Sequence, residues 1–192
     1  MMAFPRQWFA ESIAILQRTA ESAAMEAVRA AAGACSRALA NGLPLLVCGN
    51  GGSAADAQHI TCELVGRFLK ERRGQNVICL ADNAATLTAW ANDYSYDDVF
   101  ARQVEAYGRP GGVLIGLSTS GNSANVVRAF ERARAEGLVT VAFTGEGGGK
   151  LAALADHLIA VPSRVTPLVQ QAHLCLYHWL CAAIEAEMAG AA

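Results

Sequence analysis

Two apolar runs in this sequence each end in a small turn rich in glycine and hydroxyl groups, and a helical pattern follows each turn. The first unit is Leu45–Glu63 (LLVCGNGGSAADAQHITCE). The second begins with Gly112–Leu117 (GVLIGL) and turns at Ser118–Ser123 (STSGNS). A short apolar run without polar alternation is typical of a strand buried on both faces. The two units therefore predict parallel strands that end at the same edge of a sheet, with a turn at each end.

The same alternation continues along the chain and predicts the fold class. The runs that we interpret as strands are Leu45–Cys48, Val77–Leu80, Val113–Leu117, Val139–Phe143 and His157–Val161. Helical patterns begin near Ser53, Asn83, Tyr96 and Ser123, and a last one spans Thr166–Met188. Strands that alternate with helices predict a five-stranded parallel sheet covered by helices on both faces, an α/β fold of three layers.

An alanine-rich segment of helical pattern precedes the first predicted strand. It runs from Trp8 to Ala40, which is enough chain for about two helices, and Asn41-Gly42 is a typical C-cap. Because no linker or low-complexity stretch divides the chain, we expect one domain over 1–192, with a helical segment at 1–42 and an α/β core at 43–192. The alanine-rich helices also suit packing against another subunit.

Composition and charge argue against several classes of protein. The net charge is −2, and the only basic cluster, Lys70–Arg73, contains Glu71, so we interpret it as a solvated helix end and expect no nucleic-acid partner. The six cysteines show no CxxC spacing and are interpreted as reduced core residues. No signal-peptide pattern and no apolar window long enough for a membrane span are present, so we expect a cytoplasmic protein.

The two turns have the composition of an anion site. Gly49, Gly51 and Gly52 let backbone N–H groups approach an anion, and Ser53 opens a helix whose dipole favours negative charge. The second turn offers the hydroxyl groups of Ser118, Thr119, Ser120 and Ser123. Together the turns predict a phosphate site that needs no lysine. The alternative is two tight turns in which Ser53 and Ser123 are helix N-caps.

Neither turn matches a nucleotide-binding fingerprint. GNGGSA departs from G-x-G-x-x-G at its third glycine, and no GK[ST] follows. A third glycine-rich run, Thr144–Gly149 (TGEGGG), also follows a predicted strand, and we interpret it as a plain turn. These observations favour a sugar phosphate over a nucleotide as the ligand.

Titratable side chains follow the first turn at helical spacing. His59 and Glu63 are spaced i, i+4 and share one helix face, toward which the carbons of a bound sugar phosphate would extend. On the last predicted helix, Gln170 and His178 interrupt an apolar pattern. A carboxylate and a histidine transfer protons, whereas two histidines, a carboxylate and an amide oxygen hold a divalent metal. Both interpretations stay open, as does a hydrogen-bonded polar set without function.

Four motifs in this order resemble the phosphoheptose isomerases of the SIS (sugar isomerase) family: GNGGSAADAQHI, ANDY at Ala91–Tyr94, STSGNS and PLVQQAHLCLYH. The resemblance covers nearly the whole chain and implies the three-layer SIS fold. It also implies conversion of sedoheptulose 7-phosphate to D-glycero-D-manno-heptose 7-phosphate through an enediol(ate). That reaction is the first step toward the heptose of lipopolysaccharide or related surface glycans.

The resemblance further implies roles for individual residues. Glu63 would be the base that moves a proton from C1 to C2, with His178 as an acid/base at the sugar oxygens. Arg67, one helical turn past Glu63, would face the substrate, and Asn92 and Asp93 would contact sugar hydroxyl groups. The implied substrate-binding residues are Asn50, Gly51, Gly52, Ser53, Glu63, Arg67, Asn92, Asp93, Ser118, Thr119, Ser120, Ser123 and Gln170.

A metal and an oligomer are implied in the same way. Some family members bind zinc at positions that match His59, Glu63, Gln170 and His178, so the resemblance implies about one zinc per subunit. A carboxylate tied to zinc has fewer lone pairs free for proton transfer, so a catalytic zinc and a zinc bound only at rest both stay open. The family's enzymes are tetramers, which implies a homotetramer with sites shared between subunits.

Two other readings of the chain belong to different functional classes. A non-enzymatic SIS protein that binds the bacterial replication initiator has a similar length, but it does not need the acid/base pair of Glu63 and His178 that this chain keeps. An isomerase of another phosphosugar, or a sugar-phosphate sensor, is the second alternative. Sensors are usually fused to a DNA-binding module, for which this chain has no room. The sequence does not measure the number of sugar carbons.

Overall fold

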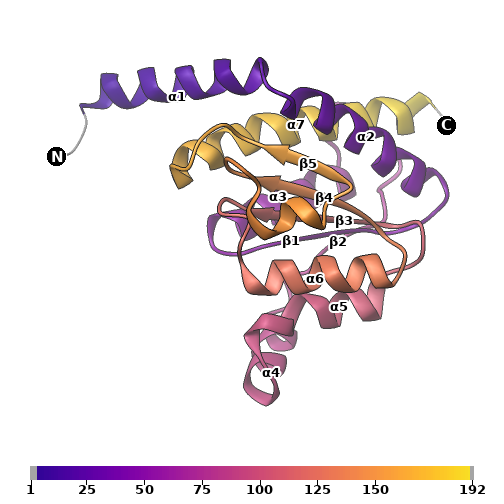
Figure 1. The fold of residues 1–192 in the computed structure, drawn as a ribbon. Helices are drawn as coiled ribbons and strands as arrows, with labels where there is room; N and C mark the ends of the chain where they lie inside the picture. The colour runs from indigo at the N-terminus through magenta and orange to yellow at the C-terminus, as the bar shows by residue number, and fades with distance from the viewer. Residues whose placement is uncertain (1–3, 191–192) are drawn as a thin grey trace.

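A computed structural model describes residues 4–190 and confirms the predicted α/β fold (Figure 1). Within these residues, five parallel strands form one sheet in the order β2-β1-β3-β4-β5. The strands are β1 (Leu45–Gly49), β2 (Val77–Cys79), β3 (Val113–Ser118), β4 (Val139–Thr144) and β5 (His157–Ala160). Each begins at its predicted first residue and ends within one residue of its predicted end, because the apolar runs mark the buried part of each strand.

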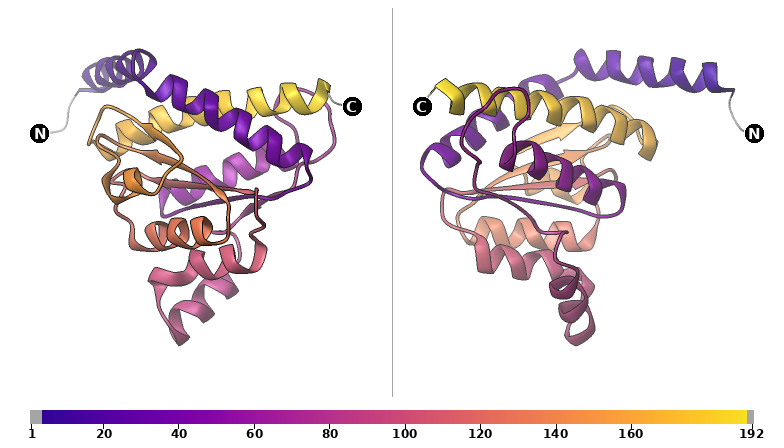
Figure 2. Two further views of the ribbon diagram at one scale, coloured as in Figure 1. Left: turned by 45° about the vertical axis from the view of Figure 1, so that its right-hand side comes forward. Right: turned by 180° about the vertical axis from the view of Figure 1, so that it is seen from behind.

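Helices cover both faces of the sheet. They are α1 (Pro5–Ala20), α2 (Ala24–Ala40), α3 (Gly52–Val65), α4 (Ala84–Asp93), α5 (Val99–Tyr107), α6 (Ala124–Ala135) and α7 (Thr166–Gly190), with short 3₁₀ helices at η1 (Tyr96–Asp98) and η2 (Gly149–Ala153). The layer of α2, α3 and α7 packs on one face, and α5 and α6 pack on the other (Figures 1 and 2). Among the described residues, no helix combines the length and the apolar character needed to span a membrane.

Alternate residues of the central strands belong to two hydrophobic cores. On β1, Leu45 and Val47 face the core under α2, α3 and α7, whereas Leu46 and Cys48 face the core under α5 and α6. All the residues of β1 and β3 are buried. This is why the strands are continuous apolar runs in the sequence: a strand covered on both faces has no solvent side on which a polar residue would be favoured.

The two N-terminal helices differ in where they pack. The α2 helix lies against α7 and β5, and its buried residues include Val28, Ala31 and Cys35. Of these two helices, α1 is the one that extends past the body of the molecule (Figure 1), and Phe9 and Ile13 on it are exposed. The expected boundary at residue 42 divides the sequence into a helical segment and an α/β core. In the folded chain the two parts are not separate, because α2 packs into the hydrophobic core that it shares with α3 and α7.

The cap at the end of α2 is confirmed. Asn41 is the C-cap residue, and Gly42 follows it with φ +72°, a left-handed conformation that favours glycine. The expectation that the cysteines are core residues holds for four of the six, because Cys62 and Cys175 are exposed.

Candidate active site

The sheet order brings the two predicted phosphate turns together. Strands β1 and β3 are neighbours, and Gly49 pairs with Leu117 at their carboxyl ends. The chain leaves β1 toward β2 on one side and leaves β3 toward β4 on the other, so this edge is a switch point of the topology. The turns at residues 50–53 and 118–123 therefore begin side by side, as predicted.

Side-chain amides join these two turns. Asn50 Nδ2 donates to Asn125 Oδ1, and Asn125 Nδ2 donates back to Asn50 Oδ1, both over 2.8 Å. The hydroxyl group of Tyr96 also donates to Asn50 Oδ1 over 3.0 Å. We did not predict Tyr96 or Asn125, which lies in the first turn of α6, as site residues. The sequence motif of one loop gives no sign of a partner far along the chain.

The hydroxyl groups of the two turns are not used as helix caps. The N-cap of α3 is Gly51, with φ +55°, and Ser53 lies inside the helix and is buried. Ser123 stands at the N-cap of α6, but its side chain makes no capping hydrogen bond; its Oγ lies 2.9 Å from Ser118 Oγ. The alternative that both serines are N-caps is therefore wrong, and the Ser123 hydroxyl group lies against that of Ser118 at the end of β3 instead.

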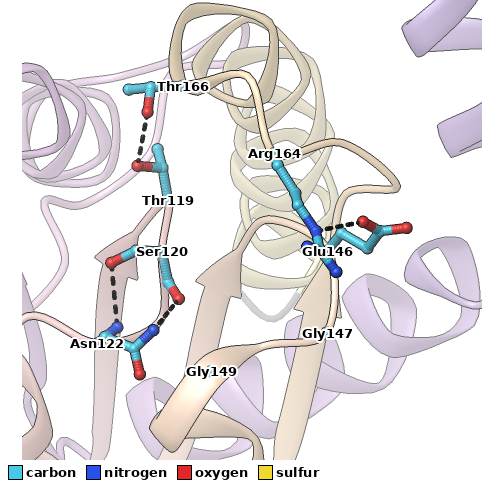
Figure 3. Close-up of a pocket in the computed structure, with 8 residues that line it drawn as sticks. All are labelled: Thr119, Ser120, Asn122, Glu146, Gly147, Gly149, Arg164 and Thr166. Atoms are coloured by element: carbon cyan, nitrogen blue, oxygen red, sulfur yellow. Dashed lines mark hydrogen bonds and ion pairs between the residues drawn. The ribbon is translucent and has the colours of Figure 1, made fainter.

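A pocket of about 460 Å³ opens beside the second turn (Figure 3). It is lined by Thr119, Ser120, Asn122, Glu146, Gly147, Gly149, Arg164 and Thr166. Arg164 Nε donates to Glu146 Oε2 over 2.7 Å at its rim. The pocket has hydroxyl groups on the β3 side and one arginine on the β5 side, which suits an anionic ligand.

The third glycine-rich run is a turn, as we interpreted it, and it also forms part of this pocket wall. Gly147 and Gly149 line the pocket. Gly121 of the second turn has φ +66°, and a Cβ on it would collide with the backbone of Gly148. The second and third turns are therefore packed backbone to backbone, a contact that the sequence did not indicate.

The predicted pairing of His59 with Glu63 on one face of α3 is confirmed as a contact. His59 Nε2 lies 2.9 Å from Glu63 Oε1, as the i, i+4 spacing predicts. The Glu63 side chain is 19% exposed and that of His59 38%. Helix α3 begins at the first predicted phosphate turn, and His59 and Glu63 lie farther along the same helix.

A tyrosine on α7 and an aspartate on α3 extend the pair. The hydroxyl group of Tyr177 lies 3.0 Å from His59 Nδ1 and donates to Asp56 Oδ1 over 3.2 Å. Burial raises the pKa of Asp56, which the hydrogen bond from Tyr177 only partly offsets; burial and the nearby carboxylate of Asp56 raise the pKa of Tyr177. Neither residue was predicted, although the i, i+3 spacing of Asp56 and His59 was a usable signal.

Helix α7 brings two further predicted residues to the site from the same chain. The His178 ring packs edge-on against His59, with 5.0 Å between ring centroids, and its buried Nε2 has no hydrogen-bond partner within residues 4–190. A Cβ added to Gly52 would lie 2.5 Å from Nε2 of Gln170, so this side chain reaches the first turn. Thus Gln170 lies beside the first predicted phosphate turn and His178 lies beside His59.

His173, also on α7, has a different environment. It is fully buried, and its Nε2 lies 3.1 Å from the Thr144 carbonyl oxygen. Burial lowers the pKa of His173 to about 4, with a small opposing effect of that hydrogen bond, so its ring is neutral at neutral pH. His173 therefore belongs to the core and not to the site.

The expected position of Arg67 needs correction. Helix α3 ends at Val65 and Gly66 is its C-cap, so Arg67 lies in the loop beyond the helix. The Glu185 carboxylate holds this loop by accepting from the backbone N–H groups of Phe68, Leu69 and Lys70, over 2.8, 2.6 and 2.8 Å. Arg67 itself is exposed.

The basic cluster after Arg67 lies in a loop and not at a helix end; Lys70, Glu71 and Arg73 are solvated as expected, but Arg72 is not. The Arg72 side chain is 2% exposed, and its Nε lies 3.5 Å from Glu185 Oε1. It also donates to the Glu63 carbonyl oxygen over 2.8 Å. A buried ion pair therefore anchors the loop that carries Arg67, and sequence reasoning missed it because Arg72 and Glu185 are far apart in the chain.

Within residues 4–190, no recorded hydrogen bond joins Asn92 or Asp93 to the other predicted site residues. Both are exposed at the end of α4, which projects from the body of the molecule (Figure 1). Within residues 4–190, the recorded side-chain hydrogen bond of Asn92 is to its neighbour Asp93, over 2.9 Å. Their role in substrate binding stays a prediction.

The four predicted zinc ligands fit the metal by donor type. Two imidazoles, a carboxylate and an amide suit Zn²⁺, and the unpartnered Nε2 of His178 is an atom that a cation would satisfy. With His59 and Glu63 hydrogen-bonded to each other, no three His, Cys, Asp or Glu side chains within residues 4–190 form a metal-binding group. An ion on both His59 and Glu63 would therefore replace their hydrogen bond.

The fold and the paired turns define a SIS-type sugar-phosphate domain, and a family model described as "SIS domain" matches residues 7–145. A phosphoheptose isomerase of Rhodospirillum rubrum is 52% identical over 83% of this chain and 85% of its own. One from Crocosphaera subtropica is 46% identical over 94% and 92%. The structure of a phosphoheptose isomerase from Neisseria gonorrhoeae superposes with a TM-score of 0.88 at 40% identity, covering 94% of this chain and 96% of that one. The chain belongs to the phosphoheptose isomerase family.

Proposed function

We propose that this protein is an aldose-ketose isomerase that converts sedoheptulose 7-phosphate to D-glycero-D-manno-heptose 7-phosphate. The observation that carries the proposal is the placement of the His59–Glu63 contact on the helix that begins at the first phosphate turn. The names of the relatives, phosphoheptose isomerases at 52% and 46% identity, support the substrate class. The product would be a precursor for lipopolysaccharide or another surface glycan.

The phosphate group of the substrate would bind at the two turns. The hydroxyl groups of Ser118 and Ser123, 2.9 Å apart, and the N-terminal N–H groups of α6 form the second half of the cradle. The N-terminus of α3 supplies the first half. Hydroxyl and amide donors bind a phosphate without a lysine, and the helix dipoles add to the attraction. Gln170, against Gly52, would contact the same end of the substrate.

Glu63 would carry the proton between the two carbons. Its carboxylate removes a proton from C1 of the ketose, electrons move to the C2 oxygen, which takes up a proton, and an enediol(ate) forms. The aldose results when the O1 hydroxyl group loses its proton, the C1 carbonyl forms and the proton held by Glu63 returns to C2. His178 would move a proton at a sugar oxygen during ring opening or enediol formation. Glu63 is largely buried. Because little water surrounds the reacting atoms there, the electrostatic interactions that stabilise the enediolate are screened less.

We further propose that His59, Glu63, Gln170 and His178 hold one zinc ion. When bound, the metal would supply a Lewis acid that polarises a sugar oxygen. The donor types and the unpartnered Nε2 of His178 support this assignment. Glu63 would serve both zinc binding and proton transfer. A carboxylate bound to zinc has fewer lone pairs free to accept a proton, so Glu63 could not fill both roles fully at the same time.

A homotetramer in the cytoplasm is part of the same proposal. Phe4 at the N-cap of α1, Phe9 and Ile13 on α1 and Trp179 on α7 are exposed large apolar side chains. A surface of this kind favours association with another copy. The resemblance also implies substrate contacts for Asn92 and Asp93 on the projecting α4. In a tetramer these two residues would face the site of a neighbouring subunit.

A substrate panel tests the proposal and its two alternatives. The purified protein, supplied with zinc, is incubated with seven-, six- and five-carbon ketose phosphates, and the aldose phosphate is quantified. Preferential turnover of sedoheptulose 7-phosphate is the expected result. Turnover of only a shorter ketose phosphate would instead establish an isomerase of another phosphosugar. No turnover of any sugar by folded protein would overturn the enzymatic proposal and favour the initiator-binding alternative.

A further inference from the structure

A chain of three contacts runs from α3 to α7 and back through the candidate site. Asp56 Oδ1 meets the Tyr177 hydroxyl at 3.2 Å, that hydroxyl meets His59 Nδ1 at 3.0 Å, and His59 Nε2 meets Glu63 Oε1 at 2.9 Å. Each contact is a hydrogen bond only if one of its two atoms carries a hydrogen. Tyr177 has a single hydroxyl hydrogen, so it cannot donate to both Asp56 and His59.

The surroundings of Asp56 decide where that hydrogen goes. Its second oxygen, Oδ2, is buried and has no hydrogen-bond partner within residues 4–190, so Tyr177 is the donor on which this carboxylate depends. If Tyr177 turned its hydrogen to His59, this part-buried carboxylate would have no hydrogen-bond donor within residues 4–190, which costs more than a neutral hydrogen bond contributes. Tyr177 therefore donates to Asp56 and accepts from Nδ1–H of His59.

We propose that Tyr177, held by Asp56, is a positioning residue that accepts a hydrogen bond from Nδ1–H of His59 and aims Nε2 at Glu63. In the metal-free structure the 2.9 Å contact between Nε2 and Glu63 Oε1 needs a hydrogen of its own, on the ring or on the carboxyl group. A cation shared with Glu63 would displace that hydrogen and take the Nε2 lone pair, while Nδ1–H stays on Tyr177. A ligating histidine whose other N–H is fixed by a hydrogen bond is oriented and made a better donor. This inference rests on the proposed function only in taking His59 and Glu63 as the site; it requires no particular sugar.

Burial makes the arrangement rigid. Tyr177 is fully buried on α7 within the main core, and its ring packs against His59 with 5.5 Å between centroids. It also packs against the neighbouring His178 ring at 5.1 Å. The hydroxyl group therefore has a fixed position relative to both histidines, and a phenylalanine at residue 177 would keep the packing while removing only the hydroxyl.

The first test observes the Nδ1–H group of His59 directly in metal-free protein. The chain has four histidines, so ¹⁵N NMR of the imidazole nitrogens is tractable, and a His59→Asn variant identifies the His59 signals. We expect the Nδ1 hydrogen to exchange slowly with water in the wild type, because Tyr177 holds it, and to exchange fast in Tyr177→Phe. Equally slow exchange in Tyr177→Phe would overturn the proposal.

The second test measures zinc affinity by competition with a chromophoric chelator. Tyr177→Phe should weaken zinc binding by roughly 10- to 100-fold, the usual cost of losing the partner of a ligating histidine. Tyr107→Phe, an exposed tyrosine on α5, is the matched control and should bind zinc as the wild type does. Equal affinity of Tyr177→Phe and wild type would contradict the proposal.

Variants of Asp56 separate the hydrogen bond from mere packing. Asp56→Asn keeps an oxygen that accepts from Tyr177 and should retain most of the zinc affinity, whereas Asp56→Ala should lose about as much as Tyr177→Phe. Asp56→Ala with unchanged affinity, in protein that thermal unfolding shows to be folded, would remove Asp56 from the account. Neither readout needs sugar turnover, so failure of the proposed isomerase reaction would leave these results interpretable.

Discussion

The side chains of Asn50 and Asn125 form a reciprocal pair of hydrogen bonds, each 2.8 Å long, across the gap between the first phosphate turn and the start of α6. An amide is suited to this role because it donates and accepts in one plane. Asn125 is 3% exposed, so water does not readily replace its partner. The pair therefore fixes the spacing of the two turns that would share one phosphate group.

Removing this pair should affect both stability and substrate binding. Asn125→Ala leaves the amide of Asn50 short of a partner in a part-buried site, so we expect the free energy of unfolding to fall by about 1–3 kcal/mol. The Michaelis constant for the sugar phosphate should rise because the turns are no longer held together. Urea unfolding and steady-state kinetics measure the two effects, and unchanged values of both would remove the pair from the account.

The hydroxyl groups of the second turn should contribute to binding more than to turnover. Ser120→Ala combined with Ser123→Ala removes two donors, and hydrogen bonds to a charged phosphate contribute roughly 1.5–3 kcal/mol each. We expect the Michaelis constant to rise on the order of 100-fold or more, with a smaller change in kcat. If the Michaelis constant stays the same, the phosphate group binds elsewhere.

His173 gives a pH dependence whose sign follows from its environment. Its pKa falls from 6.5 in the unfolded chain to about 4 in the fold because burial disfavours the charged ring. The unfolded chain thus binds more protons below pH 6.5, so stability is complete above that pH and is lost as the pH falls toward 4, by about 3 kcal/mol. Urea unfolding between pH 7.5 and 4.5 measures it.

A His173→Gln variant is the control for that loss. Glutamine keeps a donor for the Thr144 carbonyl oxygen but does not titrate. The variant should be less stable at neutral pH, and its stability should change less over the same window. Equal slopes in the variant and the wild type would show that His173 is not the group responsible.

Metal content tests the proposed zinc site separately from catalysis. Protein purified without chelators should contain about one zinc per chain, and His178→Ala should reduce that content. His157→Ala, a histidine on β5 outside the proposed ligand set, is the matched control and should retain zinc. Zinc-free wild-type protein that does not take up added zinc would remove the metal from the account.

Local patterns predicted the parts of the fold that depend on local physics. Leu45 and Val113 were recognisable as strand starts because strands buried on both faces are continuous apolar runs. The His59–Glu63 contact was equally accessible, because a helix fixes the direction of side chains at i, i+4. In each case the residues that interact are neighbours in one element.

The features that were missed depend on contacts between distant segments. Asn50 and Asn125 are 75 residues apart, and Tyr177 and Asp56 are 121 apart. The buried pair of Arg72 and Glu185 looked like surface charge because a run of basic residues is usually solvated. No periodicity encodes such pairs; they exist only once the sheet has brought α3, α6 and α7 together.

The most direct test of the central claim is NMR of the zinc-supplemented protein with sedoheptulose 7-phosphate in deuterated water, with Glu63→Gln measured alongside. If Glu63 carries the proton through an enediol(ate), the wild type yields an aldose 7-phosphate with deuterium at C2, and the variant yields none while still binding the sugar. Unchanged substrate with folded wild-type protein, or the same product from Glu63→Gln, would contradict the account.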